Sequence, residues 1–143
     1  MKIVLGSDHG GLALKEYIKV YLDENNYDYT DIGVDTDRSV DYPIYGRLAA
    51  EAVARGDYDK GIVFCGTGIG ISIAANKVHG IRCALCTSEY MASMSRKHND
   101  ANMLALGGRI LEPDCAIGIV ETWLNTEFEG ERHQKRVEML NQM

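Results

Sequence analysis

The chain has 143 residues, with 15 Lys and Arg against 21 Asp and Glu, so its formal net charge is −6. This length suits one domain over residues 1–143, and 45% hydrophobic residues are typical of a globular protein. The negative charge argues against nucleic-acid or membrane partners, because phosphate groups attract positive faces. No apolar run is long enough for a signal sequence or a membrane span, and four cysteines without such a signal indicate reduced thiols in the cytoplasm.

Short apolar runs alternate with helical spacing along the chain. They predict strands at 3–5, 27–32, 61–64, 81–85 and 103–106, and helices near 14–22, 44–55, 71–77, 88–97, 113–124 and 131–143. Such alternation is typical of βαβ units, so we predict an α/β fold: a three-layer α/β/α sandwich with a five-stranded parallel, Rossmann-like sheet. Ligands bind beyond the carboxyl ends of strands in such folds, which directs attention to loops 7–11, 33–43, 65–70 and 107–109.

Metal and redox chemistry have one candidate motif, the CxxC pair of Cys83 and Cys86. Both residues lie in or beside a predicted strand, where side chains three apart point to opposite faces of the sheet. We therefore expect two separate core thiols. The histidines show no HxH or HxxxH spacing, and the sequence predicts no metal site.

The segment 65–70, Cys-Gly-Thr-Gly-Ile-Gly, follows the third predicted strand and leads into a helix. Its alternating glycines let backbone N–H groups surround an anion at a helix N-terminus. The same groups and the helix dipole favour the thiolate form of Cys65. Tight packing of helix on strand explains the glycines equally well, and a structural role is commoner for such a cysteine.

Two further motifs carry groups suited to proton transfer. Asp8 and His9 end the first predicted strand, where they suit acid–base chemistry or, equally, a capping role. His98 ends a predicted helix, where the dipole favours its protonated form and a role as general acid. A helix-capping cluster is the plainer interpretation of His98.

Arg132 and Arg136 are spaced i, i+4 on the last predicted helix, so their guanidiniums share a face. Two guanidinium groups suit a phosphate dianion. The equal alternative is a solvated surface on which Glu129 and Glu131 neutralise the pair.

Several motifs recur together in one order over essentially the whole chain. They are Ser7-Asp8-His9-Gly10-Gly11, Asp41-Tyr42-Pro43, the segment 65–70, Asn76-Lys77 with Gly80-Ile81-Arg82, and the segment 95–102 with Gly107 and Arg109. In this pattern the chain resembles the sugar-phosphate isomerase family that contains type B ribose-5-phosphate isomerases and galactose-6-phosphate isomerases. The resemblance implies a phosphorylated sugar as substrate, no cofactor or metal, and a homodimer or dimer of dimers in which each site takes residues from both subunits.

The resemblance also implies roles for individual residues. Cys65 is expected to be the base that moves a proton between C1 and C2 of the open-chain sugar, with Thr67 assisting, while His98 opens the furanose ring beside Asp8. The substrate contacts that it implies are His9, Tyr42, Gly66, Gly68, Ile69, Gly70, Asn99, Arg109, Arg132 and Arg136.

The expected reaction is interconversion of ribose 5-phosphate and ribulose 5-phosphate, a step of the pentose phosphate pathway. The family's galactose-6-phosphate enzymes divide their functional residues between two different chains, whereas this chain carries both Cys65 and His98. Two alternatives stay open: an isomerase of a hexose 6-phosphate such as allose or galactose 6-phosphate, and a non-catalytic module that senses a sugar phosphate or nucleotide.

Overall fold

A parallel sheet forms the frame of the protein, and the computed structural model describes all of residues 1–143. Its strands are β1 (Lys2–Ser7), β2 (Asp28–Asp31), β3 (Lys60–Cys65), β4 (Cys83–Leu85) and β5 (Met103–Gly107). They run parallel in the order β2-β1-β3-β5-β4. The α/β class and the five-stranded parallel sheet predicted from the sequence are confirmed.

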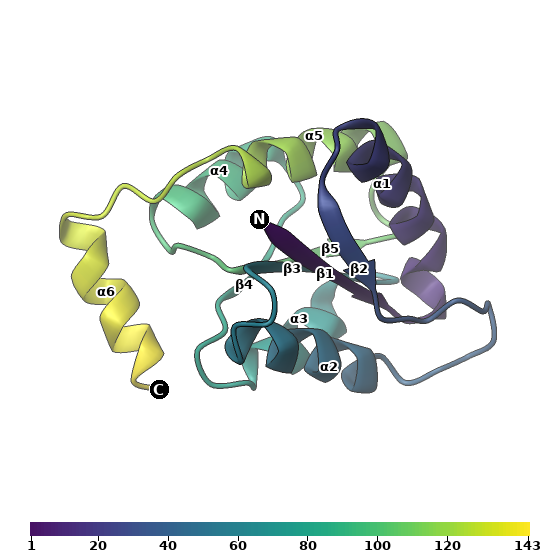
Figure 1. Ribbon diagram of the computed structural model, residues 1–143, viewed down its shortest axis with the longest axis horizontal. Helices are drawn as coiled ribbons and strands as arrows, with labels where there is room; N and C mark the ends of the chain where they lie inside the picture. The colour runs from purple at the N-terminus through teal and green to yellow at the C-terminus, as the bar shows by residue number, and fades with distance from the viewer.

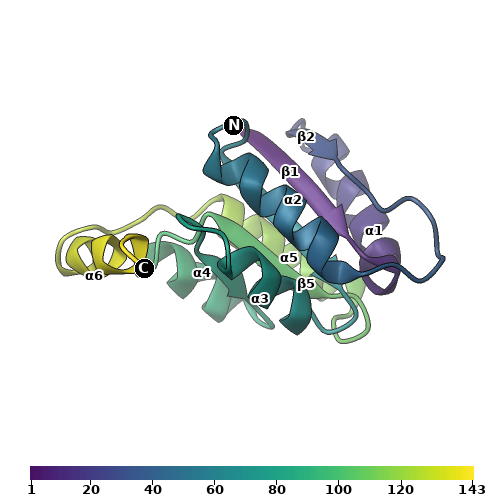
Figure 2. The same cartoon turned by 90° about the horizontal axis from the view of Figure 1, so that it is seen from below.

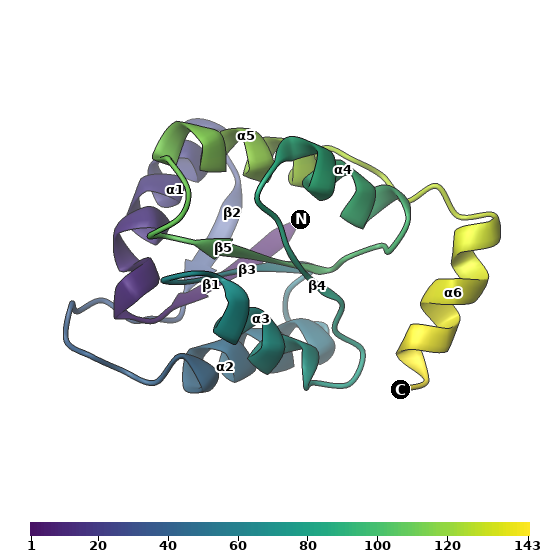
Figure 3. The ribbon, with the colours of Figure 1, turned by 180° about the vertical axis from the view of Figure 1, so that it is seen from behind.

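Helices cover both faces of the sheet. On one face lie α1 (Leu12–Glu24), α4 (Glu89–Lys97) and α5 (Pro113–Leu124), and on the other lie α2 (Tyr42–Ala54) and α3 (Ile69–Asn76), as Figures 1 and 2 show. A short 3-10 turn, η1 (His9–Gly11), precedes α1. The last helix, α6 (Arg132–Asn141), stands apart at one end of the molecule (Figures 1 and 3). None of these helices is both long and apolar enough to cross a lipid bilayer.

The alternation of side chains along each strand divides the core into two apolar clusters. Ile62 and Phe64 of β3 point to the face covered by α1, α4 and α5, where Trp123 is fully buried. Val63 and Cys65 point to the face covered by α2 and α3. The central strand is therefore buried on both faces, which its nearly continuous apolar run predicts.

The CxxC thiols lie on opposite faces of the sheet, as predicted. Cys83 packs against the cluster under α2 and α3, whereas Cys86 belongs to the cluster under α4 and α5. Burial raises the pKa of both thiols, that of Cys86 to about 11. Both are therefore neutral core groups near neutral pH.

The fourth strand is shorter than its apolar run predicts, because a side chain accepts a backbone hydrogen bond where the run begins. Ile81 closes a turn by donating its N–H to the carbonyl of Val78. The N–H of Arg82 bonds to Oδ1 of Asn102 at 2.8 Å instead of entering the ladder. The strand begins only at Cys83, on the edge of the sheet.

Candidate functional site

The loops that follow β1, β3 and β5 pack together at the carboxyl edge of the sheet. Gly108 donates its N–H to the carbonyl of Cys65 at 2.8 Å, and Arg109 donates to that of Gly66 at 2.9 Å. Asp8 donates its N–H to a carbonyl of β3 at 3.2 Å. Strand addition reverses direction between β1 and β3, and parallel α/β proteins bind ligands at such a switch point.

The thiol of Cys65 lies at this edge, at the end of β3. The residue is 5% exposed, and its Sγ accepts the N–H of Gly68 at 3.1 Å. Gly68 has a φ of +81°, a conformation that favours glycine and that turns the chain from β3 into α3. The sulfur is thus held at a helix N-terminus, as expected from the sequence.

Only part of the expected amide cradle is free to receive an anion. Gly68 uses its N–H on the sulfur of Cys65, and Ile69 donates its N–H to Oγ1 of Thr67 at 3.2 Å. The N–H groups of Thr67 and Gly70 make no hydrogen bond within the chain. The N–H of Gly66 is likewise unbonded. These three amides, in the turn before α3 and at its start, are the donors that segment 66–70 offers to a ligand.

Two side chains from other loops lie over the same segment. The ring of Tyr42 lies against Gly70, where an added Cβ would be 2.6 Å from two ring carbons. The guanidinium of Arg109 lies over Gly66, where an added Cβ would be 3.1 Å from Nη1. An aromatic hydroxyl and a cation therefore border the loop that carries Cys65.

Asp8 has the capping role that the sequence offered for it, and a hydrogen bond orients His9. Asp8 is buried, and its Oδ1 accepts the N–H of Gly11 at 3.1 Å, which is a capping bond. Nδ1 of His9 accepts the N–H of Val40 at 3.2 Å, so the loop before α2 orients the ring. In the neutral ring this leaves Nε2–H as a donor.

These residues form what we call the carboxyl-edge cluster: Asp8, His9, Tyr42, Cys65, Gly66, Thr67, Gly68, Ile69, Gly70 and Arg109. The other four predicted site residues lie elsewhere and form what we call the amino-edge cluster: His98, Asn99, Arg132 and Arg136.

Within one subunit, the two clusters lie at opposite ends of the folded molecule. Cys65 pairs with Gly107 at the carboxyl end of β5, whereas His98 comes shortly before Met103 at its amino end. The strand between these ends spans about 13 Å. In Figures 1 and 3, α6 and the end of α4 lie at the end of the molecule remote from the loops after β1 and β5.

The guanidiniums of the amino-edge cluster are free of acidic partners within the chain. Arg132 and Arg136 are exposed on α6, and neither forms an ion pair. Glu129, one of the two acids near them in the sequence, instead faces two imidazoles. The arginine pair is therefore available to an anion.

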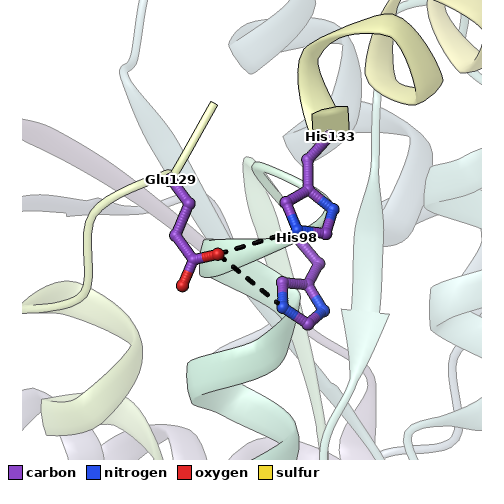
Figure 4. Close-up of side chains that lie close together, drawn as sticks. All are labelled: His98, Glu129 and His133. Carbon is purple, nitrogen blue, oxygen red and sulfur yellow. Dashed lines mark ion pairs between the residues drawn. The ribbon is translucent and has the colours of Figure 1, made fainter. Parts of the chain in front are cut away.

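His98, Glu129 and His133 form a compact group where α4 ends and α6 begins (Figure 4). The two imidazole rings stack with centroids 4.1 Å apart and planes inclined by 13°. Oε1 of Glu129 lies 3.9 Å from Nε2 of His98 and 3.6 Å from Nε2 of His133. Desolvation, followed by the charges of His98 and the neighbouring arginines, lowers the pKa of His133, so this ring favours its neutral form.

These three residues have metal-ligand chemistry, but the stacked rings do not have metal-site geometry. A histidine ligand binds a metal through a lone pair that lies in the plane of its ring. Planes inclined by only 13° do not intersect near either nitrogen of His98 and His133, so one ion cannot lie in both planes. Binding a metal through both rings would require at least one of them to turn.

The sequence profile described as Ribose/Galactose Isomerase matches residues 3–140. The chain belongs to this family. Ribose-5-phosphate isomerase B of Escherichia coli is 48% identical over 139 residues, which cover 97% of this chain and 93% of that protein.

Solved structures agree with the assignment to this family. The ribose-5-phosphate isomerase B of Clostridium thermocellum superposes with a TM-score of 0.98 at 56% identity, covering 99% of this chain and 96% of that one. The enzyme of Mycoplasma genitalium, solved with bound ribulose-5-phosphate, gives a TM-score of 0.94 at 40% identity, covering 99% and 94%. The protein is a sugar-phosphate isomerase of the ribose-5-phosphate isomerase B group.

Sequence reasoning did not single out Glu129 and His133 as a pair. Their i, i+4 spacing was visible, and it is the spacing at which side chains meet on a helix. The two residues are nevertheless not on one helix, because Glu129 lies in the loop before α6. Their contact with His98 depends on how this loop folds back.

Proposed function

We propose that this isomerase interconverts ribose 5-phosphate and ribulose 5-phosphate, with Cys65 as the base. The observation that carries the proposal is the place of the Cys65 sulfur, which lies at the switch point of the sheet, 3.1 Å from the N–H of Gly68 and next to the unused amides of α3. Proton transfer between C1 and C2 needs a base beside these carbons and donors for the developing oxyanion. The ribulose-5-phosphate bound to the Mycoplasma genitalium relative supports a five-carbon substrate.

The reaction begins with ring opening of the furanose. The bond between C1 and the ring oxygen breaks, the ring oxygen gains a proton, and the anomeric hydroxyl loses one as the aldehyde forms. In our proposal His98 serves this step, with Asp8 and Tyr42 beside it. An imidazole suits the work because it can give and take a proton near neutral pH.

Isomerisation then moves a proton between adjacent carbons. The thiolate of Cys65 takes the proton from C2, and the electron pair moves onto O1 to give an enediolate. The proton returns to C1 while the O2 hydroxyl proton moves to O1, with Thr67 assisting, so that the carbonyl ends at C2. Within segment 66–70, the free N–H groups of Gly66, Thr67 and Gly70 stabilise the negative charge. The remaining substrate contacts are His9, Asn99, Arg109, Arg132 and Arg136, of which His9 and the last two hold the phosphate.

We propose that the two clusters form one site when two copies pair, in a homodimer that stands alone or is part of a dimer of dimers. In such a dimer the carboxyl-edge cluster of one subunit meets the amino-edge cluster of the other. Exposed apolar side chains on three helices support pairing. They are Ile44 and Leu48 on α2, Ile69 and Ile73 on α3, and Met139 and Leu140 on α6.

The test of the chemistry is a direct assay. Purified protein should convert ribose 5-phosphate faster than allose 6-phosphate or galactose 6-phosphate, and Cys65→Ala should lower turnover by at least about 1,000-fold. Faster turnover of a six-carbon substrate would contradict the proposed specificity. Full activity of Cys65→Ala would remove the thiol from the role of base.

Mixing two inactive variants tests the shared site. Cys65→Ala and His98→Ala damage different clusters, so a mixed dimer has one doubly damaged site and one intact site. Random exchange of subunits should restore about one quarter of wild-type activity. If each site were built from one chain, the mixture would stay as inactive as its parts.

A further inference from the structure

The imidazole of His98 has no hydrogen bond within the chain to fix its direction. The residue caps α4, and its backbone N–H bonds to the carbonyl of Met94 at 2.9 Å. The side chain itself is 39% exposed. A half-exposed side chain at a helix end can populate several rotamers, whereas a group that transfers protons must be held to within roughly 0.5 Å.

His133 and Glu129 supply the contacts that His98 otherwise lacks (Figure 4). The ring of His133 covers one face of the His98 ring at a centroid distance of 4.1 Å. The carboxylate of Glu129 faces the Nε2 edge of both rings, at 3.9 and 3.6 Å. A stacked ring restricts the plane of an imidazole, and a carboxylate beside its N–H restricts the direction in which that edge points.

The burial of His133 leaves one of its polar atoms without a hydrogen-bond partner, which by itself would destabilise the fold. The residue is 6% exposed, yet its Nε2 has no hydrogen-bond partner within the chain. A buried polar atom without a partner is destabilising, and each such atom needs an explanation. The side chain that Nε2 faces is Glu129, which also faces His98.

The backbone holds this pair in register with His98. Glu129 donates its N–H to the carbonyl of Lys97 at 3.1 Å, one residue before His98. Gly130 and Glu131 follow with φ values of +70° and +54°, and this reversal starts α6. His133 then donates its N–H to the carbonyl of Gly130 at 3.0 Å, which places its ring over His98.

We propose that Glu129 and His133 are positioning residues that hold the imidazole of His98 in the orientation needed for ring opening. The inference rests on the proposed function, in which His98 opens the sugar ring. His133 sets the plane of the imidazole, and Glu129 sets the direction of its Nε2 edge. They act on the sugar only through His98.

Two measurable rates distinguish an effect on ring opening from an effect on the later proton transfer. Conversion of ribose 5-phosphate requires the furanose ring to open. Exchange of the C1 hydrogen of ribulose 5-phosphate with deuterium from D₂O requires only the proton transfer at Cys65, because this ketose, with its 5-hydroxyl phosphorylated, is an open chain. The first is measured as turnover, and the second by mass spectrometry of recovered ribulose 5-phosphate.

Glu129→Ala should lower turnover of ribose 5-phosphate about 10-fold while leaving deuterium exchange within about twofold of the wild-type rate. His133→Asn should affect both rates in the same way. His133→Phe keeps a stacked ring, so it should retain most of the turnover that His133→Asn loses. His98→Ala gives the full effect for comparison. Glu138→Ala is the matched control, because Glu138 is an exposed acid of α6 that pairs only with Gln134, and both of its rates should match the wild type.

Equal loss of both rates in Glu129→Ala would mean general damage to the site and would overturn the inference. So would unchanged turnover in both Glu129→Ala and His133→Asn. A wild-type protein that exchanges deuterium but fails to convert ribose 5-phosphate would instead overturn the proposed function. His98→Ala with unchanged turnover would remove the role on which the inference rests.

Discussion

The ring of Tyr42, the first residue of α2, lies directly against the Cα of Gly70 in the first turn of α3. A Cβ on Gly70 would be 2.6 Å from two carbons of that ring. The third glycine of the segment 65–70 therefore serves a purpose besides presenting its N–H. It lets an aromatic side chain from a distant part of the chain reach the loop that carries Cys65.

Gly70→Ala should displace the Tyr42 ring without unfolding the protein, because Tyr42 is exposed and can turn away. We expect kcat/KM for ribose 5-phosphate to fall about 10-fold, since the ring borders the site. A double-mutant cycle with Tyr42→Ala checks the cause: once the ring is absent, adding Gly70→Ala should cost much less. Equal effects of Gly70→Ala in both backgrounds would show that the methyl group acts elsewhere.

Gly11→Ala should prevent folding. A Cβ on Gly11 would be 2.4 to 2.5 Å from backbone atoms of Phe64, and a central strand cannot move aside. Gly56→Ala is the control for a glycine with open space around it, because its φ of +85° costs only about 1 to 2 kcal/mol. Circular dichroism and chemical denaturation measure the folding and stability of both variants. A Gly11→Ala protein as stable as Gly56→Ala would contradict the close packing of Gly11 against Phe64.

Arg96→Lys should destabilise the protein by about 2 kcal/mol and reduce turnover of ribose 5-phosphate. The buried guanidinium donates to the carbonyls of Thr126 and Ala101 and to the carboxylate of Asp100, at 2.8 to 3.1 Å. A lysine cannot reproduce this planar set of bonds, which holds the segment around His98. The exposed Arg47→Lys substitution is the control, and denaturation with the isomerase assay reports both effects.

The stability contributed by Lys60 should change between pH 8 and pH 10.5. Burial lowers the pKa of this amine to about 8 from its usual 10.5. Within that interval the unfolded chain binds more protons than the folded one, so the contribution of Lys60 to the free energy of unfolding rises with pH. Below pH 8 the cost of keeping the amine charged is fully present.

Lys60→Met should therefore be more stable than the wild type at pH 7, by a margin that shrinks as the pH approaches 10.5. Denaturant unfolding of both proteins at several pH values measures this margin. The exposed Lys135→Met substitution controls for the loss of a charge. A margin that stays constant with pH would contradict the lowered pKa.

Residue periodicity predicted much of the fold. Ile62, Val63 and Phe64 are buried on alternating faces because a parallel sheet is covered on both sides, and an unbroken apolar run records that burial. The same two-residue period predicted that Cys83 and Cys86 lie on opposite faces of the sheet. The late start of β4 was not predictable from its own residues, because it depends on the bond that the N–H of Arg82 donates to Oδ1 of Asn102, 20 residues further along the chain.

The place of the candidate site was predictable to a similar extent. Loops that follow strands meet at the carboxyl edge, and Cys65, Asp8 and Arg109 do lie there. The place of His98 was also implied, because a helix between two parallel strands ends at their amino edge. The contact of His98 with His133 was not, since it depends on the backbone reversal at residues 130–131.

The opposite placement of the two clusters has a consequence for how activity arises. If each active site is shared between two subunits, an isolated chain carries both clusters but has no complete site. The rate at low chain concentration should then rise with the square of that concentration, until pairing is complete. Association would act as the step that turns a folded chain into an enzyme.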